Sequence, residues 1–107
     1  MTKRNRSAVT LAVVLSLAGA VSFAQSGGEA TYKAKCQMCH GTSGLADSPA
    51  GKSMKVKPVS DPDVKKLSEA QMVDAVRNGM GKMQAYKDKL TDDQIKDAVT
   101  YFRTFLK

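Results

Sequence analysis

The last part of the chain carries apolar residues at the spacing of an amphipathic helix. This apolar stripe consists of Ile95, Val99, Phe102 and Leu106, widened by Ala98, Tyr101 and Phe105. Thr91 and Gln94 have the spacing of a capping box, which marks the start of a helix. Asp92 and Asp93 suit the positive end of the helix dipole. The pattern therefore predicts a helix from Thr91 to about Leu106 with one buried face.

A second amphipathic helix is predicted over Glu69–Asn78. Ser68 and Gln71 repeat the capping-box spacing in front of it, and Gly79 is a typical residue at a helix end. The apolar side of this helix consists of Met72, Val73 and Val76.

Two more helices are predicted nearer to the N-terminus. The capping-box spacing of Ser26 and Glu29 predicts a helix that starts near Ser26 and ends at Gly41. Asp61 and Pro62 can open a short helix, because proline is favoured in the first turn. No segment shows the alternation of a strand, so the sequence predicts an all-α fold with three to four helices.

Two long segments between these helices contain several glycine residues. The first runs from Gly41 to Ser60 and the second from Gly79 to Leu90. A loop as long as the first is uncommon in a compact domain unless it is functional. We therefore expect the first loop to wrap around a bound group.

Residues 1–24 have the layout of a secretory signal peptide. A basic start precedes an uncharged apolar run, which ends in small residues at Ser22 and Ala24. We expect cleavage after Ala24, which leaves residues 25–107 as one domain exported to the periplasm. A retained membrane anchor is the alternative, but the apolar run is short for a span of about 20 residues. We expect no stable membrane insertion after cleavage.

Charge and composition limit the possible partners. Removal of the cations Lys3, Arg4 and Arg6 with the leader lowers the formal charge from +7 to +4. The lysines are spread along the chain and are not interleaved with aromatic residues, so nucleic acid is not an expected partner. A small domain without tryptophan has little core of its own. A large apolar cofactor would supply the missing core.

Both cysteines and the single histidine of the chain lie close together, at Cys36, Cys39 and His40. The spacing Cys-x-x-Cys-His is the attachment pattern of haem c. The two thiols can form thioethers with the haem vinyl groups, and the adjacent imidazole can ligate the iron.

Three other uses of these residues fit the sequence less well. A thioredoxin-like pair would need a strand–helix context, which is not visible. A structural zinc site would need a fourth ligand. A simple disulfide would leave the histidine unexplained. We therefore expect one covalently bound haem c, with His40 as the proximal ligand of its iron.

A second axial ligand must come from elsewhere, and a methionine thioether is the natural candidate in a chain without another histidine. Met38 lies inside the attachment motif, and Met72 lies on a predicted core face. Met54, in the first loop, is also a candidate ligand. Met80 and Met83 lie in the second loop beside two glycines, which allow the backbone to approach a haem closely. The residues alone favour this last pair.

The chain resembles the small bacterial class I c-type cytochromes over nearly all of residues 25–107. The resemblance rests on the attachment motif with Gly41, on Asn-Gly-Met-Gly-Lys-Met-Gln-Ala-Tyr at residues 78–86, and on residues 90–95 with Tyr101 and Phe102. It implies a small cytochrome c fold wrapped around one haem, with Met83 as the distal ligand. Gln84 stands where the family usually has proline.

The resemblance also implies contacts within the fold. The N- and C-terminal helices should pack together through Gly28, Tyr32, Tyr101 and Phe102. A loop proline carbonyl should accept a hydrogen bond from the free N–H of His40, and Pro58 is a better match than Pro49. Pro58 is either this acceptor or only a turn residue.

We interpret the chain as a soluble periplasmic electron carrier and not an enzyme, because His40 and Met83 would leave no open site for substrate. We expect a monomer that docks on redox proteins with acidic patches. The lysines near the expected haem edge are Lys33, Lys35, Lys52, Lys55, Lys82 and Lys87. Two alternatives stay open: a haem sensor or peroxidase-like enzyme with a labile Met83, and a haem subunit of a larger oxidoreductase.

Overall fold

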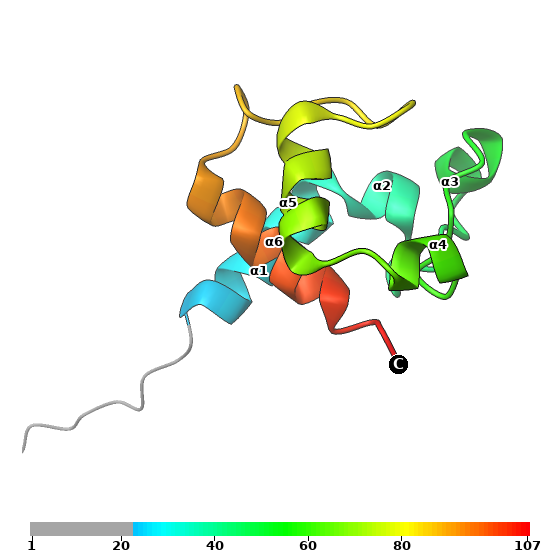
Figure 1. Cartoon of the computed structure of the whole chain (residues 1–107), viewed down its shortest axis with the longest axis horizontal. Helices are drawn as coiled ribbons and strands as arrows, with labels where there is room; N and C mark the ends of the chain where they lie inside the picture. Colours follow the sequence, from blue (N-terminus) through cyan, green and yellow to red (C-terminus); the bar gives the residue numbers. More distant parts are fainter. Residues whose placement is uncertain (1–22) are drawn as a thin grey trace, which may run out of the picture.

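The computed structural model describes residues 23–107, so nearly all of the predicted leader lies outside the described residues. Its helices are α1 (Phe23–Lys35), α2 (Gln37–His40), α3 (Pro49–Ser53), α4 (Pro62–Lys65), α5 (Glu69–Asn78) and α6 (Asp92–Arg103). The described residues contain no strand, only an isolated bridge between Met80 and Met83. The all-α prediction is confirmed. Figure 1 shows α1, α5 and α6 grouped together, with α3 and α4 at the far side of α2.

One one-turn helix, α3, adds to the helices predicted from sequence, and the helix predicted to end at Gly41 is divided into α1 and α2. A turn at Cys36 separates α2 from α1. Helix α3 lies inside the first predicted loop, where Ser48 Oγ accepts a hydrogen bond from the Gly51 N–H at 3.0 Å. The predicted start of α1 at Ser26 is wrong, because the helix already begins at Phe23. Alanine and glutamine, both good helix formers, precede Ser26 and extend the helix past it.

The predicted caps of α5 and α6 are present. The Ser68 N–H donates to Gln71 Oε1 at 2.8 Å, and the Gln71 N–H donates to Ser68 Oγ at 3.1 Å. Thr91 and Gln94 exchange the same two bonds at 2.9 Å and 3.2 Å. Each cap satisfies backbone donors that a helix start leaves unpaired. Helix α6 ends at Arg103, earlier than the predicted end near Leu106.

Helices α1 and α6 cross in close contact (Figure 1). A Cβ atom at Gly28 would lie 2.8 Å from the carbonyl carbon of Asp97, so the crossing requires glycine at this position. Beside it, the ring centroid of Tyr32 lies 5.3 Å from that of Tyr101 and 6.2 Å from that of Phe102. The predicted packing of the N- and C-terminal helices is confirmed.

The core connects these helices to the first long loop. Tyr32 and Ile95 are the largest fully buried side chains. The Tyr32 hydroxyl donates to the Gly41 carbonyl, and the Val59 N–H donates to the Gly44 carbonyl at 2.7 Å. These bonds hold α2 and the loop after it against the end of α1. Among the described helices, none is long and apolar enough to cross a membrane.

Candidate functional site

A cavity of about 490 Å³ lies between the α1–α2 junction, the two long loops and the inner faces of α5 and α6. Its apolar wall includes Tyr32, Val56, Val64, Leu67, Met72, Ala75, Val76, Ala98, Val99 and Phe102. Cys36, His40, Met54, Met80 and Met83 line the same cavity. The structure therefore brings the attachment motif and the candidate methionines of both loops to one cavity. Its volume is within the range of about 300–1,000 Å³ that is common for cofactor sites.

The two cysteines occupy the turn at the end of α1 and the following helix α2. Both thiols are free and half-buried. Cys36 lines the cavity, and Cys39 Sγ lies 3.9 Å from Met54 Sδ at its edge. Burial, with a smaller effect of Cys39, raises the pKa of Cys36 to about 11. A thiol with a raised pKa is a poor match for disulfide exchange, which requires a thiolate.

His40 ends α2 and lines the cavity next to Phe102. The two ring centroids are 5.3 Å apart, and the rings meet edge to face. Burial lowers the pKa of His40 and so favours the neutral imidazole that a metal ligand needs. Nδ1 of the ring is buried without a hydrogen-bond partner. A buried ring nitrogen is normally paired, so the residues around this imidazole do not complete its site.

The predicted hydrogen bond from His40 to a proline carbonyl is wrong. His40 Nδ1 has no hydrogen-bond partner in the structure, so neither Pro58 nor Pro49 accepts a bond from it. The Pro58 carbonyl instead accepts the Asp61 N–H at 2.9 Å, and Pro49 opens α3. Pro58 is therefore a turn residue, which was the other possibility left by the sequence.

Met80 and Met83 come together in a tight turn of the second loop. The Met80 N–H donates to the Met83 carbonyl at 3.1 Å, and the Met83 N–H donates to the Met80 carbonyl at 2.9 Å. Gly79 and Gly81 both have positive φ, of 82° and 57°, which glycine adopts easily. Met83 is half-buried, whereas the Met80 side chain is 59% exposed.

The remaining methionines have other surroundings. Met72 is buried in the cavity wall, where its Sδ lies 3.6 Å from Arg103 Nη1. Met38 is 76% exposed and does not line the cavity. Met54 lines the cavity on the side of Cys39. The cavity walls thus include a half-buried methionine in each long loop, Met54 and Met83.

Some residues of the cavity wall were not predicted. Val64 and Leu67, in and just after α4, line it, and their spacing of three residues was the only local sign. Lys57 and Asp63 also line it and form an ion pair at 2.7 Å. Of the predicted lysines, Lys55 and Lys82 line this cavity. The position of these charged residues at the cavity depends on how the first loop folds. Composition alone does not predict this.

A family model described as cytochrome C oxidase, cbb3-type, subunit III, matches residues 24–102. The chain belongs to this cytochrome c family. No curated protein matches the chain. As a family member it is a small c-type cytochrome that carries covalently bound haem c with its iron.

Solved structures that include small c-type cytochromes have the same fold as this chain. The c-type cytochrome KustC0563 is 27% identical with a TM-score of 0.67, over 75% of this chain and 98% of its own. Cytochrome c6C from Synechococcus sp. PCC 7002 is 26% identical with a TM-score of 0.56, over 75% of this chain and 94% of its own. A chain of the reducing HAO-like protein complex of Kuenenia stuttgartiensis is 19% identical with a TM-score of 0.71, over 81% of this chain and 46% of its own.

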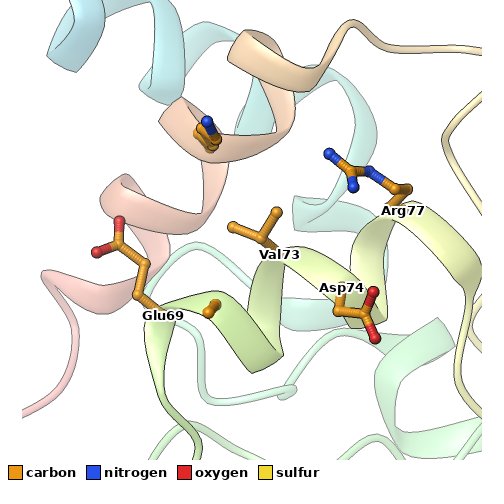
Figure 2. Close-up of a pocket in the computed structure, with 6 residues that line it drawn as sticks. Glu69, Val73, Asp74 and Arg77 are labelled. Carbon is orange, nitrogen blue, oxygen red and sulfur yellow. The ribbon is translucent and has the colours of Figure 1, made fainter.

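A second hollow of about 520 Å³ lies on the outer side of this cytochrome, between α5 and α6. Figure 2 shows Val73 pointing into it, with Glu69 and Arg77 at its two ends. Glu69 Oε1 accepts a bond from the Thr100 hydroxyl at 3.0 Å, and Arg77 pairs with Asp92 at 2.8 Å. Its lining contains no cysteine, histidine or methionine, so none of the haem candidates belongs to this hollow.

Proposed function

We propose that this cytochrome is a monohaem electron carrier that holds haem c through Cys36 and Cys39 and ligates its iron with His40 and Met83. One observation carries the proposal. His40 and Met83 are 43 positions apart in the sequence, yet Cys36, His40 and Met83 line one apolar cavity. When bound there, the haem supplies one-electron chemistry between Fe(III) and Fe(II).

The residues of the chain have separate tasks in this proposal. Cys36 and Cys39 fix the edge of the macrocycle, and His40 offers a neutral imidazole because burial lowers its pKa. Met83 offers a thioether, which raises the reduction potential relative to a nitrogen ligand. The apolar wall excludes water from the iron. His40 and Met83 would together hold the iron and leave no position open to a substrate, so the protein would act as a carrier rather than an enzyme.

The choice of Met83 over Met80 is tested by the spectrum of the oxidised protein. A methionine bound to ferric haem gives a weak charge-transfer band in the near infrared. The band should disappear in Met83→Ala and stay in Met80→Ala, which removes the neighbouring methionine of the same turn. Met54→Ala tests the remaining methionine at the cavity edge.

Two outcomes would contradict the proposal. Loss of the band in Met80→Ala or Met54→Ala, with retention in Met83→Ala, would assign the ligand to another residue. A high-spin ferric spectrum of the unmodified protein would mean an open iron position, and so a sensor or enzyme instead of a carrier.

The proposal includes export and an acidic partner. The basic start and apolar run of residues 1–24 support cleavage of a signal peptide and a periplasmic location. N-terminal sequencing of the exported protein should begin at Gln25, and a retained Met1 would exclude cleavage.

Lys55 and Lys82 at the cavity support docking on acidic surfaces. Oxidation by such a partner should slow as salt rises.

A second candidate is a haem subunit of a larger oxidoreductase. The description of the matched family names an oxidase subunit, which favours this possibility. Purification from native membranes and from the periplasmic fraction separates the two candidates. A carrier should be recovered alone from the periplasm, and a subunit should be recovered with a membrane complex.

A further inference from the structure

A chain of side-chain hydrogen bonds runs from the second loop to the end of α1. The Lys89 ammonium donates to Gln84 Oε1 at 2.7 Å, and Gln84 Nε2 donates to the Tyr86 hydroxyl at 3.1 Å. The Tyr86 hydroxyl donates to the Lys35 carbonyl at 3.2 Å. Each group donates to the next, so the bonds polarise one another in the same direction. Lys89 also lies 5.7 Å from the centroid of the Tyr86 ring, where a cation is attracted.

The last acceptor in this series of hydrogen bonds is the Lys35 carbonyl. It lacks its usual helical donor because a turn separates α1 from α2. The N–H groups of Cys39 and His40 both donate to the Cys36 carbonyl, at 3.2 Å and 3.0 Å. The usual donor to the Lys35 carbonyl, the N–H of Cys39, is therefore directed to another residue. The Tyr86 hydroxyl takes its place. The bond joins the second loop to the residue directly before Cys36.

Gln84 follows Met83 directly, and its backbone has little other restraint. Among the described residues, the backbone bonds of the turn run between Met80 and Met83, and none is donated by the Gln84 N–H. Tyr86, in contrast, is buried, and its N–H donates to the Val76 carbonyl of α5 at 2.9 Å. The Gln84 amide thus connects the segment beside Met83 to a fixed point in the core.

We propose that Gln84 and Tyr86 are positioning residues that hold Met83 at the iron. Their hydrogen bonds restrain the second loop where the family usually has proline, and they do so relative to the turn that carries Cys36. This inference rests on the proposed ligation by Met83. It predicts that breaking either bond increases the fraction of molecules in which Met83 has left the iron.

Imidazole measures this fraction, because it binds ferric haem only where the methionine has left. The apparent dissociation constant therefore falls in proportion as the competent fraction rises. A single hydrogen bond stabilises a structure by about 0.5–1.5 kcal/mol, which corresponds to roughly twofold to tenfold in an equilibrium constant. Gln84→Ala in the haem-loaded protein should lower the apparent dissociation constant of imidazole by about threefold to tenfold. Tyr86→Phe, which keeps the ring, should have an effect of similar size.

The coupling between the two residues is tested by the double variant. Because Gln84 and Tyr86 act in one chain, the double variant should bind imidazole about as tightly as the tighter-binding single variant. Effects that add fully, or a Gln84→Ala variant within twofold of the unmodified protein, would overturn the inference.

Gln94→Ala is the matched control. It also removes one glutamine amide in a hydrogen bond, but at the start of α6. It should lower resistance to denaturant and leave the imidazole affinity within twofold of that of the unmodified protein. An equal gain of affinity in Gln94→Ala would trace the effect to general destabilisation and overturn the inference.

Met83→Ala separates this inference from the proposed function. If Met83 is the ligand, this variant should bind imidazole much more tightly than every other variant. An unchanged affinity in Met83→Ala would reject the ligand itself. A large gain in Met83→Ala with no change in Gln84→Ala would reject only the positioning role.

Discussion

A methyl group at Gly28 should push α1 and α6 apart, whereas the same group at Gly27 should not. A Cβ atom at position 28 would lie 2.8 Å from the carbonyl carbon of Asp97 and 3.4 Å from the Cβ of Tyr101. The first contact is with backbone, which cannot rotate away as a flexible side chain does. At position 27, a Cβ atom would meet Asp97 Oδ2 at 3.9 Å, an ordinary van der Waals distance.

The two substitutions should therefore differ in their effect on stability. Overpacking at a tight contact costs about 1–3 kcal/mol, and alanine gains about 0.5–1 kcal/mol over glycine within a helix. Gly28→Ala should lower the free energy of unfolding by up to about 2.5 kcal/mol once the gain is subtracted. Gly27→Ala keeps the gain without the clash, and it should be neutral or stabilising by up to about 1 kcal/mol.

Thermal unfolding of the haem-loaded variants, followed by far-UV circular dichroism, measures this difference. For a domain of this size, 1 kcal/mol corresponds to a shift of about 4–8 °C in melting temperature. Gly28→Ala should melt below the unmodified protein, and Gly27→Ala at or above it. A Gly28→Ala variant that melts as high as Gly27→Ala would refute the reasoning, because the close approach of the helices would then not depend on the missing side chain.

Two further substitutions test the packing of the cavity wall and the cap of α6, each by denaturant unfolding of the haem-loaded protein. Met72→Ala removes a side chain that is 5% exposed, and it should lower the free energy of unfolding by about 2–5 kcal/mol; a loss below about 1 kcal/mol would mean that the wall closes over the gap. Thr91→Ala removes the cap and should cost about 0.5–2 kcal/mol. Lys96→Ala, at an exposed position of the same helix, is its control and should change stability by less than about 0.5 kcal/mol.

The elements that were predicted correctly are those whose patterns involve residues close together in the sequence. The caps of α5 and α6 join residues three positions apart, so their pattern is visible in the sequence before any folding is known. Periodicity likewise predicted the buried face of α6, where Ile95, Ala98 and Val99 are in the core. The same pattern failed at Ser26, because a serine and a glutamate at capping spacing can equally occur inside a helix.

The first long loop could not be predicted in detail. Its shape depends on contacts with distant segments, such as the approach of Gly44 to Phe105, where a Cβ atom would lie 2.9 Å from the ring. The sequence also left the role of Pro58 undecided, because its carbonyl could accept from a nearby turn or from His40. In the structure, the Pro58 carbonyl accepts the N–H of Asp61, which lies three residues further along in the same turn.

For the candidate site, the sequence predicts which chemical groups are present but not how the folded chain holds them. The spacing of Cys36, Cys39 and His40 identifies the attachment chemistry, because thioether formation and iron ligation need those three groups in that order. The departure at Gln84 was visible too, but its consequence was not. Seen alone, a glutamine in place of proline loosens a loop. Its amide instead reaches the Tyr86 hydroxyl, which bonds to a carbonyl 51 residues away in sequence. Restraint on a loop can therefore come from a long-range side-chain bond as well as from a stiff backbone, and only the folded chain distinguishes the two.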